Sequence, residues 1–444
     1  MSKCEYLEIK EFDEAGDVVA TYVASGNSRV DVVLPREKKS YSQRVLDVFL
    51  PAGYPQSVTE DYIQYQIYDS LQAFSSSIAG LLASRAVLEG VGVGDSTASP
   101  TSALLLSILQ ESMGRLATIL FAHRLGTSLE PECKMYRLAA DILNDTAIVL
   151  DCLSPAFPKP ARSAKASLSA HFAKRGNLGE LNAKDSSQET VISLLGMLTG
   201  SVVVSAVTTP MATWATLIAL LSVHLATNYA AVKAVSMTSL NRQRANIVFS
   251  HVLDADNPRV LSPKEVSEQE RVFERDGVLR YGNDILGHCR IGVSLQSLLG
   301  SMNLAMRSKT GAFQDLPIKL PDILEVFAHE GYILWLDESQ TREVRIVLKK
   351  DCTALDQLKA WVHALTLVRV RSQTPPSAFL KGEHVGQDVQ RLAELLQILK
   401  QNNELFDKYT PSLRSAGWDL DMAALETRAG LRALIDRTKD SSGQ

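Results

Sequence analysis

Two aspartates four positions apart offer the clearest potential for chemistry in this 444-residue chain. Asp141 and Asp145 lie with Asn144 in the segment RLAADILNDTAIVL, and their spacing places both carboxylates on one face of a helix. Like charges at this spacing repel, so the pair needs water or a positively charged partner. It could belong to a structural ion-pair network, or it could share a proton or bind a ligand. Basic residues that could serve as partners are Arg115, Arg137 and Lys184.

Polar residues in two other apolar segments extend this candidate site. Asp69 lies in QIYDSLQAFSSS, and a further polar group occurs in the motif AKDSSQET. Within that motif, Ser186 and Glu189 have the spacing of a capping box, which predicts that a helix starts there. A cap does not need Lys184 or Gln188, so both remain candidates for ligand contact. The candidate polar ligand site consists of Asp69, Asp141, Asn144, Asp145, Lys184 and Gln188.

The sequence lacks the motifs that are typical of enzymes and metal sites. Its five cysteines form no CxxC pair, and its eight histidines show no HxH or HxxxH spacing. The glycines from Gly90 to Gly94 follow a helical segment, so they predict a helix cap and a turn, not a phosphate-binding loop. The scattered Trp214, Trp335, Trp361 and Trp418 disfavour an ultraviolet chromophore. We therefore predict a protein that is not an enzyme and has no metal or cofactor site.

An uncharged run from Thr190 to Val232 dominates the elements that must position these residues. Thr208, Thr209 and Pro210 divide it into two apolar halves, each long enough to span a membrane. We predict a transmembrane hairpin of two helices at 190–232 that turns at Pro210. The alternative is a soluble bundle in which both helices are buried.

Basic residues flank this uncharged run at both ends. Lys233, Arg242 and Arg244 follow it. By the positive-inside tendency, both ends of the hairpin face the cytosol-like side and the Pro210 turn faces the other side. Basic residues beside a spanning helix also attract anionic lipid headgroups. The candidates for lipid-headgroup contact before the run are Arg162, Lys165, Lys174 and Arg175.

The chain as a whole predicts a mainly α protein with three parts. Alternating polar and apolar residues predict a small β meander at 1–39. A helical domain at 40–255 contains the apolar hairpin. A C-terminal α+β and helical domain follows at 256–444, in which a helix, the strands YILWLD and EVRIVLK, and a further helix succeed one another. A last helix is expected from about Met422 to Arg437.

Composition indicates a partly embedded intracellular protein. The net charge of -4 gives no general attraction to nucleic acid, and 45% of the residues are hydrophobic. The acidic N-terminus MSKCEYLEIKEFDEAGD lacks the apolar core of a secretory signal and the arginine and serine bias of a transit peptide. We therefore expect location at an intracellular membrane of unspecified organelle, with lipids and not nucleic acid as partners.

Five sequence blocks in matching order resemble the ROOT UV-B SENSITIVE family. They are VFLPAGYPQSVTEDYIQYQIYDSLQAFSSSIAG, VLEGVGVGD, RLAADILND, AKDSSQET and SLNRQR, and the resemblance extends from about Ser40 to Phe249. The helix-hairpin-helix segment at 321–370 is similar to the C-terminal domain of that family. The resemblance implies membrane association and, among plant members, roles in growth under UV-B, auxin transport and pyridoxal phosphate balance. It also implies action in pairs with relatives, without an established enzymatic chemistry.

Residues and resemblance together predict a non-enzymatic, membrane-associated protein that acts through protein and lipid contacts, as a homo- or hetero-oligomer. The alternative is a small-molecule carrier or ligand-binding membrane protein, with the candidate polar ligand site inside the helical domain. The carrier is favoured if those side chains line one enclosed cavity, and the first hypothesis is favoured if they point apart.

Overall fold

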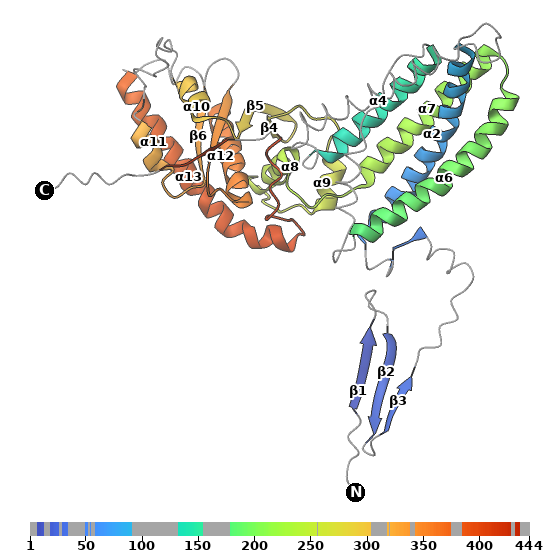
Figure 1. Cartoon of the computed structure of the whole chain (residues 1–444). Helices are drawn as coiled ribbons and strands as arrows, with labels where there is room; N and C mark the ends of the chain where they lie inside the picture. Colours follow the sequence, from blue (N-terminus) through green and yellow to red (C-terminus); the bar gives the residue numbers. More distant parts are fainter. Residues whose placement is uncertain are drawn as a thin grey trace. The chain divides into compact units, whose positions relative to one another are not determined.

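The structure is a computed structural model of the chain, which divides into two compact units (Figure 1). We call Met1–Ile119 with Arg137–Val235 the helical unit, and Leu120–Tyr136 with Ser236–Gln444 the α+β unit. The residues that the structure describes are 7–12, 18–25, 29–33, 49–51, 54, 58–90, 132–153, 178–254, 256–302, 318, 320–337, 342–373, 384–427 and 431–435.

The first strands of the chain form an antiparallel meander. β1 (Leu7–Phe12), β2 (Val18–Ser25) and β3 (Arg29–Val33) pair in the order β1-β2-β3. The register shifts between Glu11 and Phe12, as it does at a β-bulge. This is the meander that the alternating sequence pattern predicts.

Long helices make up the rest of the described helical unit. α2 lies between α6 and α7 and packs against both (Figure 1). α6 and α7 are each long and apolar enough to cross a membrane. The bounds of the helices are α2 (Tyr62–Gly90), α4 (Cys133–Leu153, in this unit from Arg137), α6 (Leu178–Ala206) and α7 (Pro210–Ala234).

The break between α6 and α7 lies where the sequence predicts it. α7 starts at Pro210, and the side chain of Thr209 accepts a hydrogen bond from a backbone amide of its first turn. The predicted helix start at Ser186 is wrong, because α6 already begins at Leu178. The amides of the predicted capping box lie inside a continuing helix, where backbone carbonyls of the preceding turn take the place of a cap.

Two glycines allow α6 to approach α2 closely. A Cβ atom added at Gly196 would lie 2.7 Å from Ser77 Cβ, and one added at Gly200 would lie 2.7 Å from Leu81 Cδ1. Both distances are shorter than van der Waals contact. At Gly196 the neighbours are a Cβ atom and a backbone carbonyl, so a larger residue there would push the helices apart. The spacing of the two glycines is the small-xxx-small pattern that is typical of closely packed membrane helices.

Arg85 of α2 binds the C-terminal end of α6. Its Nη1 donates to the carbonyl groups of Val204 and Val207, both at 2.7 Å, and its Nη2 donates to Thr213 Oγ1 at 2.9 Å. Carbonyl groups in the last turn of a helix have no partner within that helix. The guanidinium group satisfies these carbonyls and ties α2 to both of its neighbours.

A mixed sheet forms the centre of the α+β unit. Its order is β4-β5-β7-β6, and β8 also pairs with β7. β5 runs parallel to β7, whereas β4 with β5 and β6 with β7 are antiparallel. β6 and β7 are the predicted hairpin, and β4 and β5 were not predicted. The bounds are β4 (Val278–Tyr281), β5 (Asp284–Ile291), β6 (Tyr332–Asp337), β7 (Glu343–Lys349) and β8 (Arg432–Ala433).

Helices surround this sheet and complete the core. α12 packs against the sheet, α8 and α13, with the fully buried Trp361 on its inner side. Thr353 and Asp356 form the N-terminal cap of α12, with Thr353 Oγ1 3.1 Å from the Asp356 amide. The helices are α8 (Arg242–Val252), α9 (Pro263–Gln269), α10 (Leu295–Met302), α11 (Leu320–Val326), α12 (Ala354–Gln373) and α13 (His384–Ser415).

The last helix predicted near the C-terminus is wrong. Residues 421–427 are irregular, and β8 follows at Arg432–Ala433. The backbone hydrogen bonds here are tertiary, because the Leu431 amide donates to the Gly292 carbonyl at 3.1 Å and the Lys350 amide donates to the Ala433 carbonyl at 3.0 Å. These sheet contacts replace the hydrogen bonds of a local helix.

Candidate functional site

Arg137 organises the predicted aspartates inside the helical unit. Its Nη2 lies 2.6 Å from Asp69 Oδ1 on α2, and its Nε lies 3.1 Å from Asp141 Oδ2 on α4. Nη2 also donates to Gln72 Oε1 at 3.1 Å. One guanidinium group therefore joins two carboxylates from different helices. Burial raises the pKa of Asp141, and the Arg137 charge opposes this.

The second predicted aspartate of α4 has a different partner. Asp145 Oδ1 lies 2.8 Å from Nδ1 of His224 on α7, and the other ring nitrogen lies 3.2 Å from Gln72 Nε2. Because Arg137 can only donate, Gln72 presents its oxygen to Arg137 and its amide N–H to the histidine. The contacts therefore form a directed chain in which Arg137 donates to Gln72, Gln72 donates to His224, and His224 donates to Asp145.

A further amide completes the group, which we call the inner network. Asn228 of α7 donates to Asp141 Oδ2. Each aspartate of the predicted pair thus has its own partner on α7, Asn228 for Asp141 and His224 for Asp145. Asp141 also pairs with Arg137. The inner network comprises Asp69, Gln72, Arg137, Asp141, Asp145, His224 and Asn228.

The inner network as defined above does not include three of the predicted ligand residues, Gln188, Lys184 and Asn144. Gln188 of α6 accepts a hydrogen bond from Gln66 Nε2 at 2.6 Å and donates to the Phe49 carbonyl at 2.6 Å. Lys184 is half-buried on the same helix, and Asn144 is half-buried on α4. The inner network has charged or amide partners for each of its aspartates, so its geometry favours the ion-pair alternative over an open ligand cavity.

The predicted lipid contacts and the predicted basic flank after the uncharged run stand differently. Arg162, Lys165, Lys174 and Arg175 lie outside the described residues. The residues that follow the uncharged run require a correction, because Arg242 and Arg244 are buried in α8 and do not form an accessible basic flank.

Arg242 and Arg244 are neutralised within the α+β unit. Arg244 Nη1 lies 2.8 Å from Glu270 Oε1, and the same carboxylate lies 2.6 Å from Lys134 Nζ. Burial alone would raise the pKa of Glu270, but the charges of Arg244 and Lys134 lower it below its usual value. Arg242 pairs with Asp276. The sequence identifies the charges, but the partners come from distant segments and leave no local signal.

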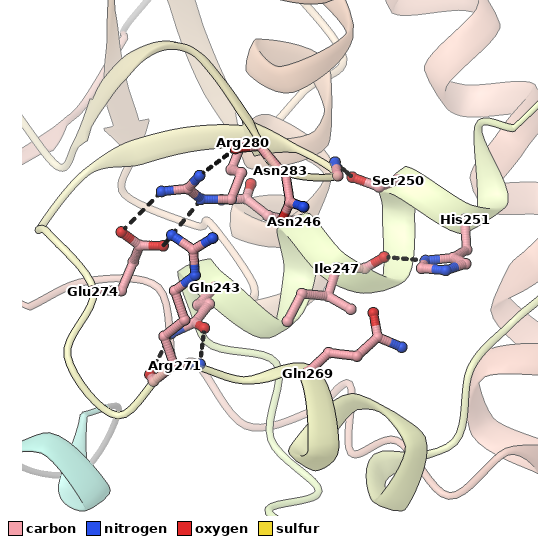
Figure 2. A pocket seen from close by; sticks show the side chains of 11 residues that line it. Gln243, Asn246, Ile247, Ser250, His251, Gln269, Arg271, Glu274, Arg280 and Asn283 are labelled. Atoms are coloured by element: carbon pink, nitrogen blue, oxygen red, sulfur yellow. Dashed lines mark hydrogen bonds and ion pairs between the residues drawn. The ribbon is translucent and has the colours of Figure 1, made fainter.

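A pocket of about 420 Å³, lined mostly by polar residue types, opens beside α8 (Figure 2). One face of α8 lines it, because Gln243, Asn246 and Ser250 follow helical spacing. The sequence analysis missed this site. No local pattern marks it, because five of the eleven residues of α8 are apolar and the charged loop of the pocket lies beyond α9. The lining residues are Gln243, Asn246, Ile247, Ser250, His251, Gln269, Arg271, Glu274, Arg280, Gly282 and Asn283.

Arg280 and Glu274 form the charged wall of this pocket. Arg280 Nε lies 3.1 Å from Glu274 Oε2, and its Nη2 lies 3.4 Å from Oε1 (Figure 2). The third nitrogen of the guanidinium donates to the Asn283 carbonyl at 2.6 Å. Because all three nitrogens have partners, the Arg280 side chain is fixed in place.

Amide side chains of α8 fix the surrounding backbone. Gln243 Nε2 donates to the Arg271 carbonyl at 2.9 Å, and Gln243 Oε1 accepts from the Arg271 amide at 2.5 Å. Asn246 accepts from Trp361 Nε1 at 2.9 Å and donates to the Val278 carbonyl at 2.8 Å. These buried amides hold the pocket walls in position. Among the described residues, no group of His, Cys, Asp and Glu side chains could hold a metal ion.

Two family profiles match nearly the whole chain. The profile described as "Vitamin B6 photo-protection and homoeostasis domain" matches residues 35–163 and 160–256. The profile described as "Root UVB sensitive protein, C-terminal" matches residues 259–428. α8 lies in the first match, and most of the pocket wall that faces it lies in the second.

Individual relatives show the same similarity over different lengths. The chain is 40% identical to "RUS family member 1" of Dictyostelium discoideum over 56% of its own length, and it spans about half of that relative, 51%. It is 29% identical to "Protein root UVB sensitive 3" of Arabidopsis thaliana, over 94% of this chain and 93% of the relative. It is 23% identical to "Protein root UVB sensitive 2, chloroplastic" of the same plant, over 92% and 90%. No solved structure matches the chain.

Proposed function

This chain belongs to the root UVB sensitive family, and we propose from this premise that it is a non-enzymatic membrane protein that acts through lipid and protein contacts. In this proposal α6 and α7 cross the bilayer as a hairpin, with α2 packed between them. The description of the matched domain names vitamin B6 homoeostasis, and we propose that the chain contributes to that process. The relatives' names refer to UV-B, and we do not extend that response to this chain.

The exposed apolar surface of α6 is the observation that carries the proposal. Only 11% of the residues in the apolar stretch of α6, within Lys184–Ala206, are buried. The core helix of a soluble protein would be mostly buried. Leu198 is 67% exposed and Val202 is 68% exposed. An apolar surface of this kind on one helix is costly in water and favourable in lipid. The exposed large apolar side chains of α6 are Val191, Leu194, Leu195, Met197, Leu198 and Val202.

The hydroxyl groups on α6 and α7 give independent support. Thr199 Oγ1 donates to the Leu195 carbonyl at 2.9 Å, and Ser222 Oγ donates to the Ile218 carbonyl at 2.8 Å. A hydroxyl that bonds to its own helix presents no unsatisfied donor to lipid. The other exposed hydroxyls with this type of bond within these two helices are Thr190, Ser201 and Ser205.

Alkaline carbonate extraction of membranes that contain the full chain tests the proposal. We expect the protein to stay in the membrane pellet in carbonate and to be released only by detergent. Release by carbonate would reject the spanning hairpin. A single cysteine in place of Thr208, in a chain whose native cysteines are changed to serine, tests the topology. A membrane-impermeant thiol reagent should label it from the side opposite to a cysteine in place of Arg414, and labelling from the same side would contradict the hairpin.

A ligand carrier is the second candidate function. The pairing of the network's aspartates counts against an open cavity, but the concentration of charged groups in the inner network is the specific observation that supports a carrier. Three carboxylates, a guanidinium group and a histidine are joined inside a largely apolar helical unit, and such groups are rare in membrane helices without a functional reason. Transport of radiolabelled pyridoxine into vesicles that contain the purified chain tests this candidate. A rate equal to that of empty vesicles would reject it for this ligand, and H224F would be expected to abolish a rate that exceeds it.

A further inference from the structure

We propose that the pocket beside α8 in the α+β unit binds a molecule that carries a phosphate group. Its volume of about 420 Å³ lies in the range of small-molecule sites. Two guanidinium groups and several amides line it, so recognition would depend on hydrogen bonds to an anion. The proposal does not depend on whether α6 and α7 cross a membrane.

Arg271 is the residue that we assign to the anion. Gln243 holds both the amide and the carbonyl of Arg271, so the base of this side chain is fixed. Its side chain is 47% exposed, and Nη1 lies 3.9 Å from Glu274 Oε2, which is beyond hydrogen-bond distance. Within the part of the chain that the structure describes, this long ion pair is the contact of the Arg271 guanidinium. Its planar set of donors therefore remains available for a phosphate group.

The rest of the charged wall favours an anion over a cation. Arg280 is fixed by Glu274 and by the Asn283 carbonyl, so it contributes a stationary positive charge. With Arg271 and Arg280 against the one carboxylate of Glu274, the charged side chains of the lining sum to +1 when His251 is neutral. The Glu274 carboxylate lies within ion-pair distance of both guanidinium groups, so two cations share one carboxylate. A ligand anion would be a second negatively charged group, and it would bind on the exposed side of Arg271.

Titration calorimetry of the detergent-purified full chain tests the proposal and the source of the anion. The soluble probes are inorganic phosphate, pyridoxine 5′-phosphate and pyridoxine. The vitamin probes are chosen because the matched domain is described by vitamin B6 homoeostasis, and they lack the aldehyde that reacts with lysines. Co-flotation with phosphatidylcholine vesicles, with and without phosphatidic acid, tests a lipid headgroup as the source.

Two arginine variants separate the pocket from general surface charge. Arg271→Gln removes the assigned cation. Arg259→Gln is the matched control, because Arg259 lies in the same unit, is 52% exposed and pairs with Glu265 at 3.2 Å, outside the pocket. We expect R271Q to weaken binding of pyridoxine 5′-phosphate by about 10-fold to 100-fold, the range for lost charge-assisted hydrogen bonds. R259Q should bind like the native chain, and pyridoxine should bind more weakly than its phosphate.

A variant with the opposite expected sign guards against misfolding as an explanation. Glu274→Gln removes the competing carboxylate and should tighten binding several-fold, which an unfolded protein cannot do. Binding only to phosphatidic acid vesicles, with loss in R271Q, would support the proposal with a lipid headgroup as ligand. The proposal is overturned if no phosphate-bearing probe binds, or if R271Q and R259Q lose affinity equally. None of these outcomes bears on the carbonate extraction that tests the membrane function.

Discussion

Helices α6 and α8 depart in opposite directions from what their compositions suggest. From Thr190 onward α6 has no charged residue, yet most residues of this apolar stretch are exposed. α8 has the sequence RQRANIVFSHV, yet nine of its eleven residues are buried, including Arg244 at 1% exposure. The difference is one of partners. The charges of α8 are neutralised by other segments of the α+β unit, whereas the apolar surface of α6 has no covering segment among the described residues.

This contrast teaches that burial of a polar helix and exposure of an apolar helix have separate causes. A buried guanidinium group is tolerated only when its charge and its donors are matched, as they are for Arg244 by Glu270 and the Ser239 carbonyl. An exposed apolar helix is tolerated when the surrounding medium is itself apolar. Substitutions in α8 and in α6 can break each half of this comparison separately.

Removing the buried charge of α8 should cause the largest loss of stability. Arg244→Ala leaves Glu270 buried with Lys134 as its remaining cation, and breaking a buried pair typically costs about 3–5 kcal/mol. Urea unfolding of the full chain, followed by tryptophan fluorescence in a W214F background, reports on Trp335, Trp361 and Trp418 of the α+β unit. The matched control is Arg414→Ala, whose exposed pair with Asp421 should leave the unfolding midpoint unchanged. Equal midpoints for both variants would contradict the role of Arg244.

Charging the exposed surface of α6 should have the next largest effect. Leu198→Lys places an ammonium group on a surface that we propose to be in lipid, at a cost of about 2.5–3.5 kcal/mol for insertion. We expect a larger carbonate-soluble fraction for L198K than for the native chain. Leu396→Lys is the control, because Leu396 is similarly exposed but lies on α13 of the α+β unit. If L198K and L396K fractionate alike, α6 does not contact lipid at this residue.

The opposite face of α6 should tolerate no added volume. Gly196→Leu introduces atoms where even a Cβ would lie 2.7 Å from Ser77 Cβ, and overpacking of this kind costs about 1–3 kcal/mol. Thermal unfolding of the detergent-purified chain, followed by circular dichroism, should occur at a lower temperature. Gly80→Ala on α2 has no atom within 4 Å of the added Cβ and should not lower it. A native midpoint for G196L would mean that α2 and α6 are not closely packed.

Substitution of Glu132, which lies near the buried charges of α8, should have the smallest effect on stability, and this effect should depend on pH. Burial raises the pKa of Glu132 from 4.5 to about 7, with the Arg244 charge opposing. Because the folded-state pKa is raised, the stabilisation from protonated Glu132 is complete below about pH 4.5 and is lost as pH rises through about 7. Glu132→Gln should therefore stabilise the α+β unit by about 1–2 kcal/mol at pH 8 and have little effect at pH 4.5.

The same tryptophan fluorescence measurement checks this pH dependence. Glu404→Gln on the exposed side of α13 is the control, and its effect should not change between the two pH values. A stabilisation by E132Q that is equal at pH 4.5 and pH 8 would show that Glu132 does not titrate in this range.

Several parts of the fold were predictable because their signals are local. The short apolar runs of β6 and β7, the cap formed by Thr353 and Asp356, and the proline that opens α7 all depend on residues close together in the sequence. The Ser186 box failed for a related reason, because the same residue types also occur inside a continuing helix. The segment after Met422 failed because its backbone pairs with the sheet, which no local pattern reveals.

The candidate sites divide in the same way. Sequence spacing identified Asp69, Asp141 and Asp145 as polar residues that need partners. It could not find Gln72, His224 or Asn228 as those partners, since they lie on other helices. The pocket beside α8 was not predictable, because its walls come from a helix, a loop and a turn whose residues are unremarkable in isolation.

By itself the sequence determined the helical character, the uncharged run with its break at Pro210, the central hairpin of the sheet and the family. These follow from periodicity, composition and short motifs, which depend on neighbours along the chain. Only the tertiary structure decided that Arg242 and Arg244 are buried, that Arg137 joins Asp69 to Asp141, and that Gln243 fixes Arg271 at the pocket. The physical reason is that a charge or a hydrogen-bond donor is satisfied by whichever group lies within about 3 Å of it. Nearness in space brings together residues that are far apart in the sequence.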